Sequence, residues 1–398
     1  MNILFVTDLY PLFEGEEGIP LTLQDFTLGF LKAGHSVQVF RPNFILNTII
    51  RKRKTYKNGL YLNSKNSDIK IFNKNFLFPF RKNSVISAYR KYFKDEKFDI
   101  ILSHMPSGIM CAEILSKELN IPYLAAVHSS DITVLEDIKY FAFKKRMISA
   151  YKNSSCVLAR SFWLKDKIRR IIPDLNKPVE IIYSGIPLKQ IEENEKKLLG
   201  ANINSEPKEA ETKPIKKFNP KKAKIITVSS LIKRKNIKTL ILAYKKLKKK
   251  RPNISLEIIG DGPMKEKLEI LNIKKKLDIK MLGKMSKEKV MEKMIDADIF
   301  ILPSLNETFG MVYMEAMSAG MAVCCTKNSG IDGIINDNEN GFLLKPNKKG
   351  VYEVLDKILN LKPKEYLNIS QNAIKTAKMF SYENSVQNYL DKIELFKI

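Results

Sequence analysis

Short apolar runs alternate with longer amphipathic stretches along most of the chain, and this alternation restricts the fold more than any other feature. In the first half, the runs predict strands at residues 3–6, 37–40, 100–103, 123–127 and 156–159. This order is typical of β-α-β units, in which helices cover both faces of a parallel sheet. Ligands of such sheets bind beyond the carboxyl ends of the strands, where we expect residues 8–20, His104 and His128.

A second series of the same kind begins near residue 225, after a segment of different composition. Residues 189–222 are highly charged, contain three prolines and lack an apolar period, so we expect a linker that is exposed from residue 205 to 220. Beyond it, strands are predicted at 225–228, 255–259, 279–282 and 299–302. A chain of 398 residues is too long for one ordinary core. The sequence therefore predicts an α/β protein with two Rossmann-like domains, residues 1–188 and 223–379, facing a central cleft.

The chain carries 69 Lys and Arg against 43 Asp and Glu, a formal charge of +26. Such an excess suggests nucleic acid or an anionic membrane as a partner. The lysines are scattered over many predicted helices, which favours a compositional origin and argues against nucleic acid. Two clusters, at residues 51–57 and 141–152, remain candidates for a membrane-docking surface, with solvated helix faces as the alternative.

Several features indicate the compartment. The first residues are predicted to form a strand, and we do not expect a signal peptide. No apolar run approaches the roughly 18 residues that span a bilayer. The four cysteines lack CxxC spacing, as is typical of reduced thiols, and three histidines argue against a metal cluster. We expect a metal-free cytoplasmic protein, either soluble or peripheral on the inner face of the cell membrane.

Two glutamates, Glu307 and Glu315, flank the start of a helix predicted directly after the strand at 299–302. The backbone N–H groups near Phe309 and Gly310 would be unpaired at that helix start, which suits a phosphate. An isolated pair of this kind is more often two solvated surface glutamates. The alternative is a site that binds a sugar and a nucleotide together.

The segment 307–323 resembles the signature of the retaining group 1 (family 4) glycosyltransferases of the GT-B fold. Shorter matches follow in the family's order over most of the chain. They are Gly34-His35, His128 to Asp131, Tyr183 to Ile186, Lys235-Asn236, Gly260 to Pro263, Asn340 to Phe342 and Phe380 to Tyr382. The resemblance implies that residues 380–398 form a helix that packs back on the first, acceptor-side domain, whereas the second domain binds the donor.

The resemblance also implies roles for the acidic and basic residues. Glu315 accepts hydrogen bonds from the ribose hydroxyls, and Glu307 faces the donor sugar, either as a nucleophile or beside an ion pair. Lys235 neutralises the diphosphate. At the family position where an arginine is common this chain has Ser230, so Lys233 and Arg234 are the candidates for a second positive charge.

Other family positions are matched less fully. His128 corresponds to a histidine near the donor sugar and the acceptor, and His104 is a weaker candidate of the same kind. Gly260 and Gly262 border the nucleotide base in the family. Glycines at these positions are also typical of a tight turn before a helix. Gly18 is the better match to a glycine of the family's phosphate-binding loop, but three acids surround it here.

The sequence thus predicts a retaining hexosyltransferase that moves a sugar from a UDP- or GDP-sugar to an acceptor hydroxyl without a metal cofactor. The acceptor is expected to be lipid-linked or part of a cell-envelope polysaccharide. The alternatives are a nucleotide-sugar epimerase or phosphorylase-like enzyme of the same fold, and a nucleic-acid-binding protein.

Overall fold

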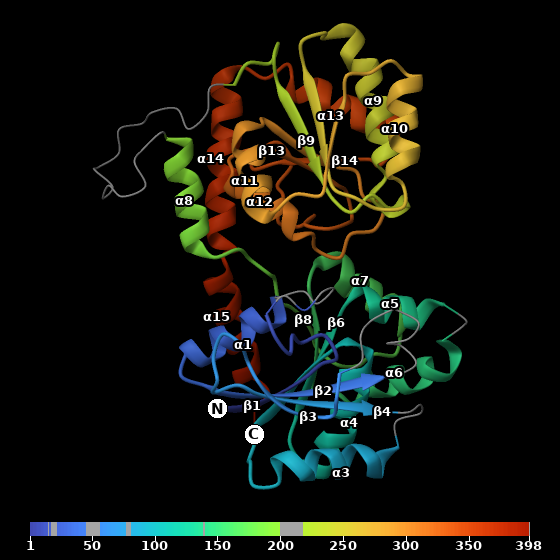
Figure 1. Ribbon diagram of the computed structural model, residues 1–398, viewed down its shortest axis with the longest axis vertical. Helices are drawn as coiled ribbons and strands as arrows, with labels where there is room; N and C mark the ends of the chain where they lie inside the picture. Colours follow the sequence, from blue (N-terminus) through green and yellow to red (C-terminus); the bar gives the residue numbers. More distant parts are fainter. Residues whose placement is uncertain are drawn as a thin grey trace. The chain divides into compact units, whose positions relative to one another are not determined.

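A computed structural model describes residues 1–14, 16, 22–44, 56–76, 81–137, 140–199 and 218–397. Its internal contacts divide the chain into two units. Unit 1 comprises Met1–Tyr183 with Ser385–Ile398, and unit 2 comprises Ser184–Asn384. Each unit has one sheet covered by helices, so the predicted α/β class is confirmed (Figure 1).

The sheet of unit 1 has eight strands in the order β3-β4-β2-β1-β5-β6-β7-β8, and all neighbours are parallel except β3 and β4. The carboxyl ends of β1, β5 and β6 therefore lie at one edge, because parallel strands point the same way. The strands are β1 (Asn2–Val6), β2 (Ser36–Phe44), β3 (Gly59–Leu62), β4 (Lys70–Phe76), β5 (Ile100–His104), β6 (Tyr123–Val127), β7 (Cys156–Ala159) and β8 (Val179–Ile181).

Helix α4 (Met105–Leu119) lies against β1 at the centre of unit 1. A Cβ atom on Gly108 would lie 2.3 Å from the Val6 carbonyl oxygen, so glycine permits this close packing. Helix α4 also packs against α3 (Lys82–Phe93), α5 (Ser129–Glu136) and α6 (Phe141–Asn153). The remaining helices of the first part of the chain are α1 (Thr22–Lys32) and α7 (Phe162–Ile171).

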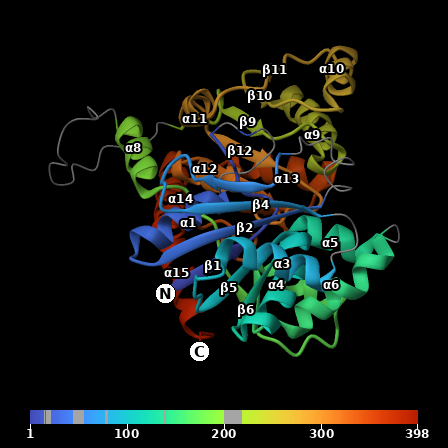
Figure 2. The same ribbon diagram turned by 60° about the horizontal axis from the view of Figure 1, so that its bottom comes forward.

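The last helix, α15 (Tyr382–Glu394), enters unit 1 at Ser385. It lies beside α1 in both ribbon views (Figures 1 and 2). The Tyr389 ring makes edge contacts with Phe26 and Phe30 of α1, with ring centroids 5.3 and 5.2 Å apart. These contacts attach the carboxyl-terminal segment to the core of unit 1.

Unit 2 contains a six-stranded parallel sheet in the order β11-β10-β9-β12-β13-β14. Helix α9 packs against α10 and α13, whereas α14 packs against α8 and α12. The strands are β9 (Lys224–Val228), β10 (Ser255–Ile259), β11 (Lys280–Gly283), β12 (Ile299–Leu302), β13 (Ala322–Thr326) and β14 (Phe342–Leu344). The helices are α8 (Leu188–Leu198), α9 (Ile237–Lys250), α10 (Lys265–Lys274), α11 (Lys287–Asp296), α12 (Met311–Ser318), α13 (Lys348–Ile358) and α14 (Pro363–Met379).

The predicted linker at 189–222 is wrong at its beginning, because residues up to Leu198 form helix α8. Ile191 and Asn194 of this helix are buried, and Glu195 forms an ion pair of 2.6 Å with Lys378 of α14. A local apolar period was thus hidden by the many charges. Residues 200–217, Gly18 and the basic residues 51–55 lie outside the described parts of the chain.

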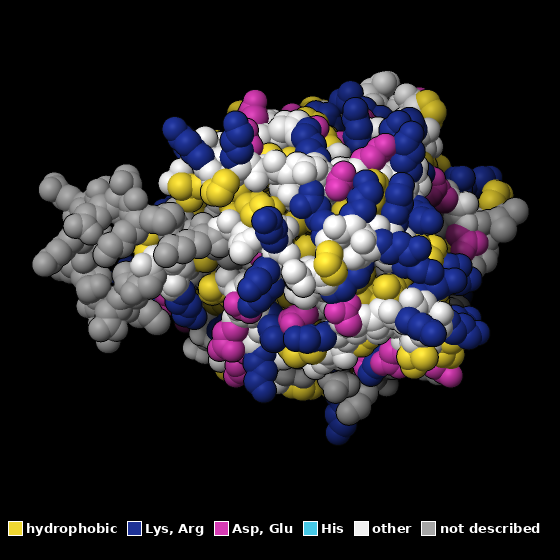
Figure 3. Space-filling model, turned by 90° about the horizontal axis from the view of Figure 1, so that it is seen from above, with side chains coloured by type: hydrophobic (Ala, Val, Ile, Leu, Met, Phe, Trp, Pro, Cys, Tyr) yellow, Lys and Arg dark blue, Asp and Glu magenta, His cyan; other side chains and the backbone are white. Residues whose placement is uncertain are grey.

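The positive charge is widely distributed in the structure. Figure 3 shows Lys and Arg side chains over much of the visible face, with Asp and Glu side chains among them. Within the described residues, many lysines pair with carboxylates, such as Lys248 with Asp278 at 2.8 Å. This distribution agrees with a compositional origin for most of the lysines.

Candidate functional site

Glu307 lies in the loop after β12, and its side chain is only 7% exposed. Lys235 Nζ contacts its Oε2 atom, and Ser304 Oγ lies 3.3 Å from the same atom. The Oε1 atom lies 3.4 Å from Arg234 Nη1. The Glu307 N–H donates a hydrogen bond of 2.7 Å to Ser329 Oγ. Both carboxylate oxygens and the backbone of Glu307 are therefore held in place.

Glu307 has a lowered pKa in this environment. Burial alone would raise it, but the charges and hydrogen bonds of Lys235 and Arg234 outweigh burial. The carboxylate is therefore ionised at neutral pH. It is a fixed negative charge with two cations beside it.

Both cations lie in a short 3-10 helix, Lys233–Lys235, that follows β9. The Lys235 side chain is 11% exposed and that of Arg234 is 39% exposed. Lys233 is exposed and forms no ion pair within the described residues. Of the two candidates for a second charge, Arg234 is thus the one that lies beside Glu307.

The predicted glycines Gly260 and Gly262 pack against the loop that leads to this short helix. A Cβ atom on Gly260 would lie 1.8 Å from the Ser229 carbonyl oxygen, and one on Gly262 would lie 2.8 Å from the Leu231 carbonyl oxygen. Both glycines have positive φ angles, 138° and 150°. The Leu231 N–H also donates a 2.8 Å hydrogen bond to the Asp261 carbonyl. These glycines therefore support the loop that positions the two cations.

Helix α12 begins directly after Gly310, whose φ is 87°. A Cβ atom there would lie 2.7 Å from the Tyr313 ring and 3.1 Å from Glu307 Cγ, so glycine is required. The Phe309 side chain is buried. The first N–H groups of α12 precede its helical hydrogen bonds, which suits an anion close to Glu307.

Glu315 lies on α12 and is partly buried. Burial raises the pKa of this carboxyl, although Lys287 lowers it. Within the described residues, the Glu315 carboxylate has no hydrogen bond or ion pair. It differs in this respect from Glu307, and its oxygens are available to accept hydrogen bonds from a ligand.

Unit 1 contains the two predicted histidines, which lie together. His104 Nδ1 is 3.0 Å from His128 Nε2, and His104 Nε2 is 2.9 Å from the Tyr389 hydroxyl. The His104 ring stacks on Phe5 with centroids 4.8 Å apart. Burial lowers the pKa of both imidazoles, that of His128 to about 3, and Arg160 contributes to both shifts. Both imidazoles are therefore neutral at pH 7. The N–H of one ring donates a hydrogen bond to the unprotonated nitrogen of the other.

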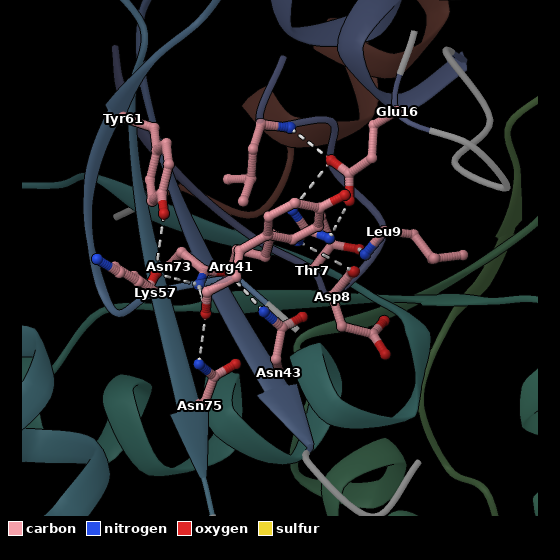
Figure 4. A network of polar contacts seen from close by, with 12 residues as sticks. Thr7, Asp8, Leu9, Glu16, Arg41, Asn43, Lys57, Tyr61, Asn73 and Asn75 are labelled. Atoms are coloured by element: carbon pink, nitrogen blue, oxygen red, sulfur yellow. Dashed lines mark hydrogen bonds and ion pairs between the residues drawn. The ribbon is translucent and has the colours of Figure 1, made fainter. Parts of the chain in front are cut away.

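An ion pair that the sequence does not predict joins β2 to the loop after β1, the loop whose three acids would repel a phosphate. Glu16 and Arg41 pair at 2.8 Å, and both side chains are 4% exposed (Figure 4). Glu16 also accepts a 2.8 Å hydrogen bond from the Leu12 N–H, and Arg41 Nε donates to the Asp8 carbonyl. Arg41 neutralises Glu16, so this acid does not oppose an anionic ligand.

No group of three or more His, Cys, Asp or Glu side chains suited to a metal ion occurs among the described residues.

Comparisons with known proteins match both units. The family model of the glycosyl transferases group 1 matches residues 208–376, and that of glycosyltransferase family 4 matches residues 17–190. An uncharacterized glycosyltransferase of Methanocaldococcus jannaschii, MJ1178, is 28% identical over 76% of this chain and 78% of its own length. The putative teichuronic acid biosynthesis glycosyltransferase TuaC of Bacillus subtilis is 28% identical over 66% of this chain and 62% of its own length.

Two solved structures share the fold over almost the whole chain. Sucrose-phosphate synthase from Thermosynechococcus elongatus superposes with a TM-score of 0.71 at 16% identity, covering 99% of this chain and 98% of that one. Anabaena HepE in complex with UDP and glucose gives a TM-score of 0.65 at 17% identity, covering 99% of both chains.

Proposed function

Because this chain belongs to the group 1 (family 4) glycosyltransferases of the GT-B fold, we propose that it moves a sugar from a nucleotide-sugar donor to an acceptor hydroxyl with retention of anomeric configuration. The observation that carries this proposal is the buried Glu307 carboxylate with Lys235 and Arg234 beside it. Transfer requires opposite charges to be stabilised at neighbouring positions, and this cluster contains both signs.

The positive and negative charges of the cluster have different roles in the proposed reaction. As the bond between the sugar and the diphosphate breaks, negative charge grows on the diphosphate and positive charge grows at the anomeric carbon. We assign the first charge to Lys235 and Arg234, and the second to Glu307, since fixed charges aimed at developing charge lower the barrier. In this proposal the two cations take the place of a metal ion, so transfer needs no metal cofactor.

We expect Glu315→Gln to weaken nucleotide binding while the fold persists. In the proposal its carboxylate accepts hydrogen bonds from both ribose hydroxyls, and a hydrogen bond to a charged group contributes roughly 1.5–3 kcal/mol, or about 10- to 150-fold in Kd. Calorimetry with UDP and GDP measures the change. The exposed Glu353 of α13 provides the control, since Glu353→Gln should leave Kd unchanged. Equal affinity of the wild type and Glu315→Gln would exclude the ribose role.

The names of similar proteins support a donor and an acceptor class. HepE is described in complex with UDP and glucose, which supports a UDP-sugar, and TuaC is named for teichuronic acid synthesis, which supports a cell-envelope or lipid-linked glycan. We place the acceptor with unit 1, where neutral His128 would bind a sugar hydroxyl. Screening the hydrolysis of UDP-, GDP- and ADP-sugars tests the donor.

We further propose that the protein works in the cytoplasm, with unit 1 on an anionic membrane surface. No helix within the described parts of the chain has the length and apolar character needed to cross a membrane. Helix α6 has an exposed Phe141, and Lys145 Nζ lies 5.7 Å from the centroid of its ring. Such exposed aromatic and basic side chains suit the lipid interface.

The surface of α6 can be tested directly. Each basic residue near an anionic membrane contributes roughly 1 kcal/mol, so replacing Lys144, Lys145 and Arg146 with glutamate should release the protein from anionic liposomes, most clearly at low salt. Flotation of liposomes measures this, and donor hydrolysis should persist. Wild-type protein that never binds the liposomes would contradict the membrane proposal.

A further inference from the structure

A pocket of about 760 Å³ lies in unit 1 beside β4 and α3, and it shares no lining residue with the candidate site described above. Three of its lining side chains are cationic and three are aromatic. The pocket cations are Lys74, Arg81 and Lys91, and the aromatic residues are Phe72, Phe76 and Tyr92. Phe72 and Phe76 are buried and Tyr92 is half-buried, so Tyr92 is the aromatic side chain of the lining that a ligand can reach. The other described lining residues are neutral.

Two basic residues of β4 and α3 that lie outside the pocket lining are paired with carboxylates. Lys70 of β4 pairs with Glu96 at 3.5 Å, and Arg90 of α3 pairs with Glu118. Within the described residues, none of the pocket cations has a carboxylate partner, and no Asp or Glu lines the pocket. Like charges gathered without a balancing acid attract an anion.

Two parts of the pocket lining are fixed by contacts within unit 1. The Phe72 ring stacks on Tyr92 with centroids 3.6 Å apart. The Asn75 N–H donates a 2.7 Å hydrogen bond to Asn58 Oδ1, and Asn75 Nδ2 donates one of 2.7 Å to the Tyr56 carbonyl. A wall that is ordered in advance lowers the entropic cost of binding.

We propose that this pocket binds the phosphate group of a phosphorylated acceptor, with an adjoining apolar or ring-bearing part of the acceptor against the half-buried Tyr92. This inference rests on the proposed transfer function. A phosphate ester carries about −1.5 to −2 charges and several acceptor oxygens, and an arginine binds it through paired N–H groups. A neutral sugar would not balance three cations.

The position of the pocket agrees with this role. Lys74 and Phe76 lie near the carboxyl end of β4, and His104 ends β5 at the same edge of the sheet. Three strand spacings separate β4 from β5, roughly 14 Å at about 4.8 Å each. Phe72, Lys74 and Phe76 project from the face of the sheet that α3 covers, whereas His104 stacks on Phe5 on the opposite face. In the proposal an extended acceptor therefore passes over the carboxyl edge of the sheet, with its phosphate in the pocket and its hydroxyl near the histidine pair.

Phenyl phosphate is a suitable probe, because it joins one phosphate to one ring, and phenol is its uncharged counterpart. The pocket variant carries Lys74→Gln, Arg81→Gln and Lys91→Gln, and its charge-matched control carries Lys32→Gln, Lys94→Gln and Lys97→Gln, which are exposed in unit 1 and outside the pocket. Ligand-observed NMR measures Kd. We expect wild-type protein to bind phenyl phosphate in preference to phenol, a Kd at least ten times higher in the pocket variant, and a change below twofold in the control. No binding, or equal losses in both variants, would overturn the proposal.

Vesicles of phosphatidylglycerol distinguish the source of the phosphate. Displacement of phenyl phosphate by vesicles, with weaker vesicle binding in the pocket variant than in the control, supports a lipid-borne phosphate. Phenyl phosphate binding that vesicles do not affect supports a soluble phosphorylated acceptor. Donor hydrolysis in the same samples separates the two proposals. Hydrolysis without phenyl phosphate binding overturns the phosphate pocket alone, whereas phenyl phosphate binding without hydrolysis of any donor supports the pocket and contradicts the proposed function.

Discussion

Replacing Glu307 with glutamine is expected to reduce turnover about 100- to 1,000-fold while the fold persists. The amide has nearly the same shape and can still accept hydrogen bonds from Lys235 and Ser304, but it lacks the negative charge that would stabilise the sugar cation. Donor binding should change much less than turnover, because the positive charge on the sugar develops only as the bond breaks. Release of nucleoside diphosphate over time gives kcat and KM, and thermal unfolding checks the fold.

Glu195→Gln is the matched control for this variant. Glu195 also forms an ion pair within unit 2, with Lys378, but it lies on α8 and has no contact with the Glu307 cluster in the described structure. Its turnover should stay within twofold of the wild type. If Glu307→Gln retained full turnover, or if both variants lost activity equally, the charge of Glu307 would have no role in the reaction.

Replacing Lys235 with alanine should also reduce turnover about 100-fold, and it should reduce turnover more than it weakens donor binding, because the charge that Lys235 balances grows as the diphosphate leaves.

The same variant should change the pH dependence of the activity. Lys235 is the stronger of the two influences that lower the pKa of Glu307, so this pKa should rise in the variant. A carboxylate with a higher pKa is protonated at higher pH. Residual activity should therefore begin to fall at a higher pH than in the wild type as the solution is acidified.

Lys233→Ala is the control for Lys235→Ala. It removes the same charge from the same short helix, but Lys233 is exposed and forms no ion pair with Glu307 in the described structure. Its turnover and pH profile should match those of the wild type. Equal losses in the two variants would mean that the general positive charge of this loop matters, rather than the contact between Lys235 and Glu307.

The sequence predicts β6 and β12, in which every residue is buried, because their apolar runs are continuous. It does not predict β13, although all five of its residues are buried too. It does not predict β4, since Asn73 and Asn75 interrupt the apolar pattern. In the structure Asn73 is fully buried and accepts a hydrogen bond from Asn43 on the next strand. A polar residue of a strand can thus lie in the core when it has a polar partner. The partner of Asn73 lies thirty positions away in the sequence, so the local pattern does not reveal it.

In the candidate site, too, local features could be predicted from the sequence, whereas contacts between distant residues could not. The segment around Glu307 and Glu315 predicts a loop and a helix start, and both are present. The pairing of Glu307 with Lys235 joins residues 72 positions apart, and the contact of His104 with Tyr389 joins residues 285 positions apart. Residue type and spacing name such residues as candidates but do not state which of them touch. The preference for Arg234 over Lys233 beside Glu307 required the folded chain for the same reason.

Proton NMR of the products of a nucleotide-sugar donor, with EDTA present throughout, tests most directly whether Glu307, Lys235 and Arg234 carry the reaction. We predict that at least one UDP-, GDP- or ADP-sugar is cleaved without added metal, and that the first sugar product has the anomeric configuration of the donor. We also predict that Glu307→Gln and Lys235→Ala lose this cleavage, whereas Lys233→Ala keeps it. Inverted product, a strict need for magnesium or manganese, or full cleavage by Glu307→Gln would contradict the assignment of the reaction to the cluster of Glu307, Lys235 and Arg234.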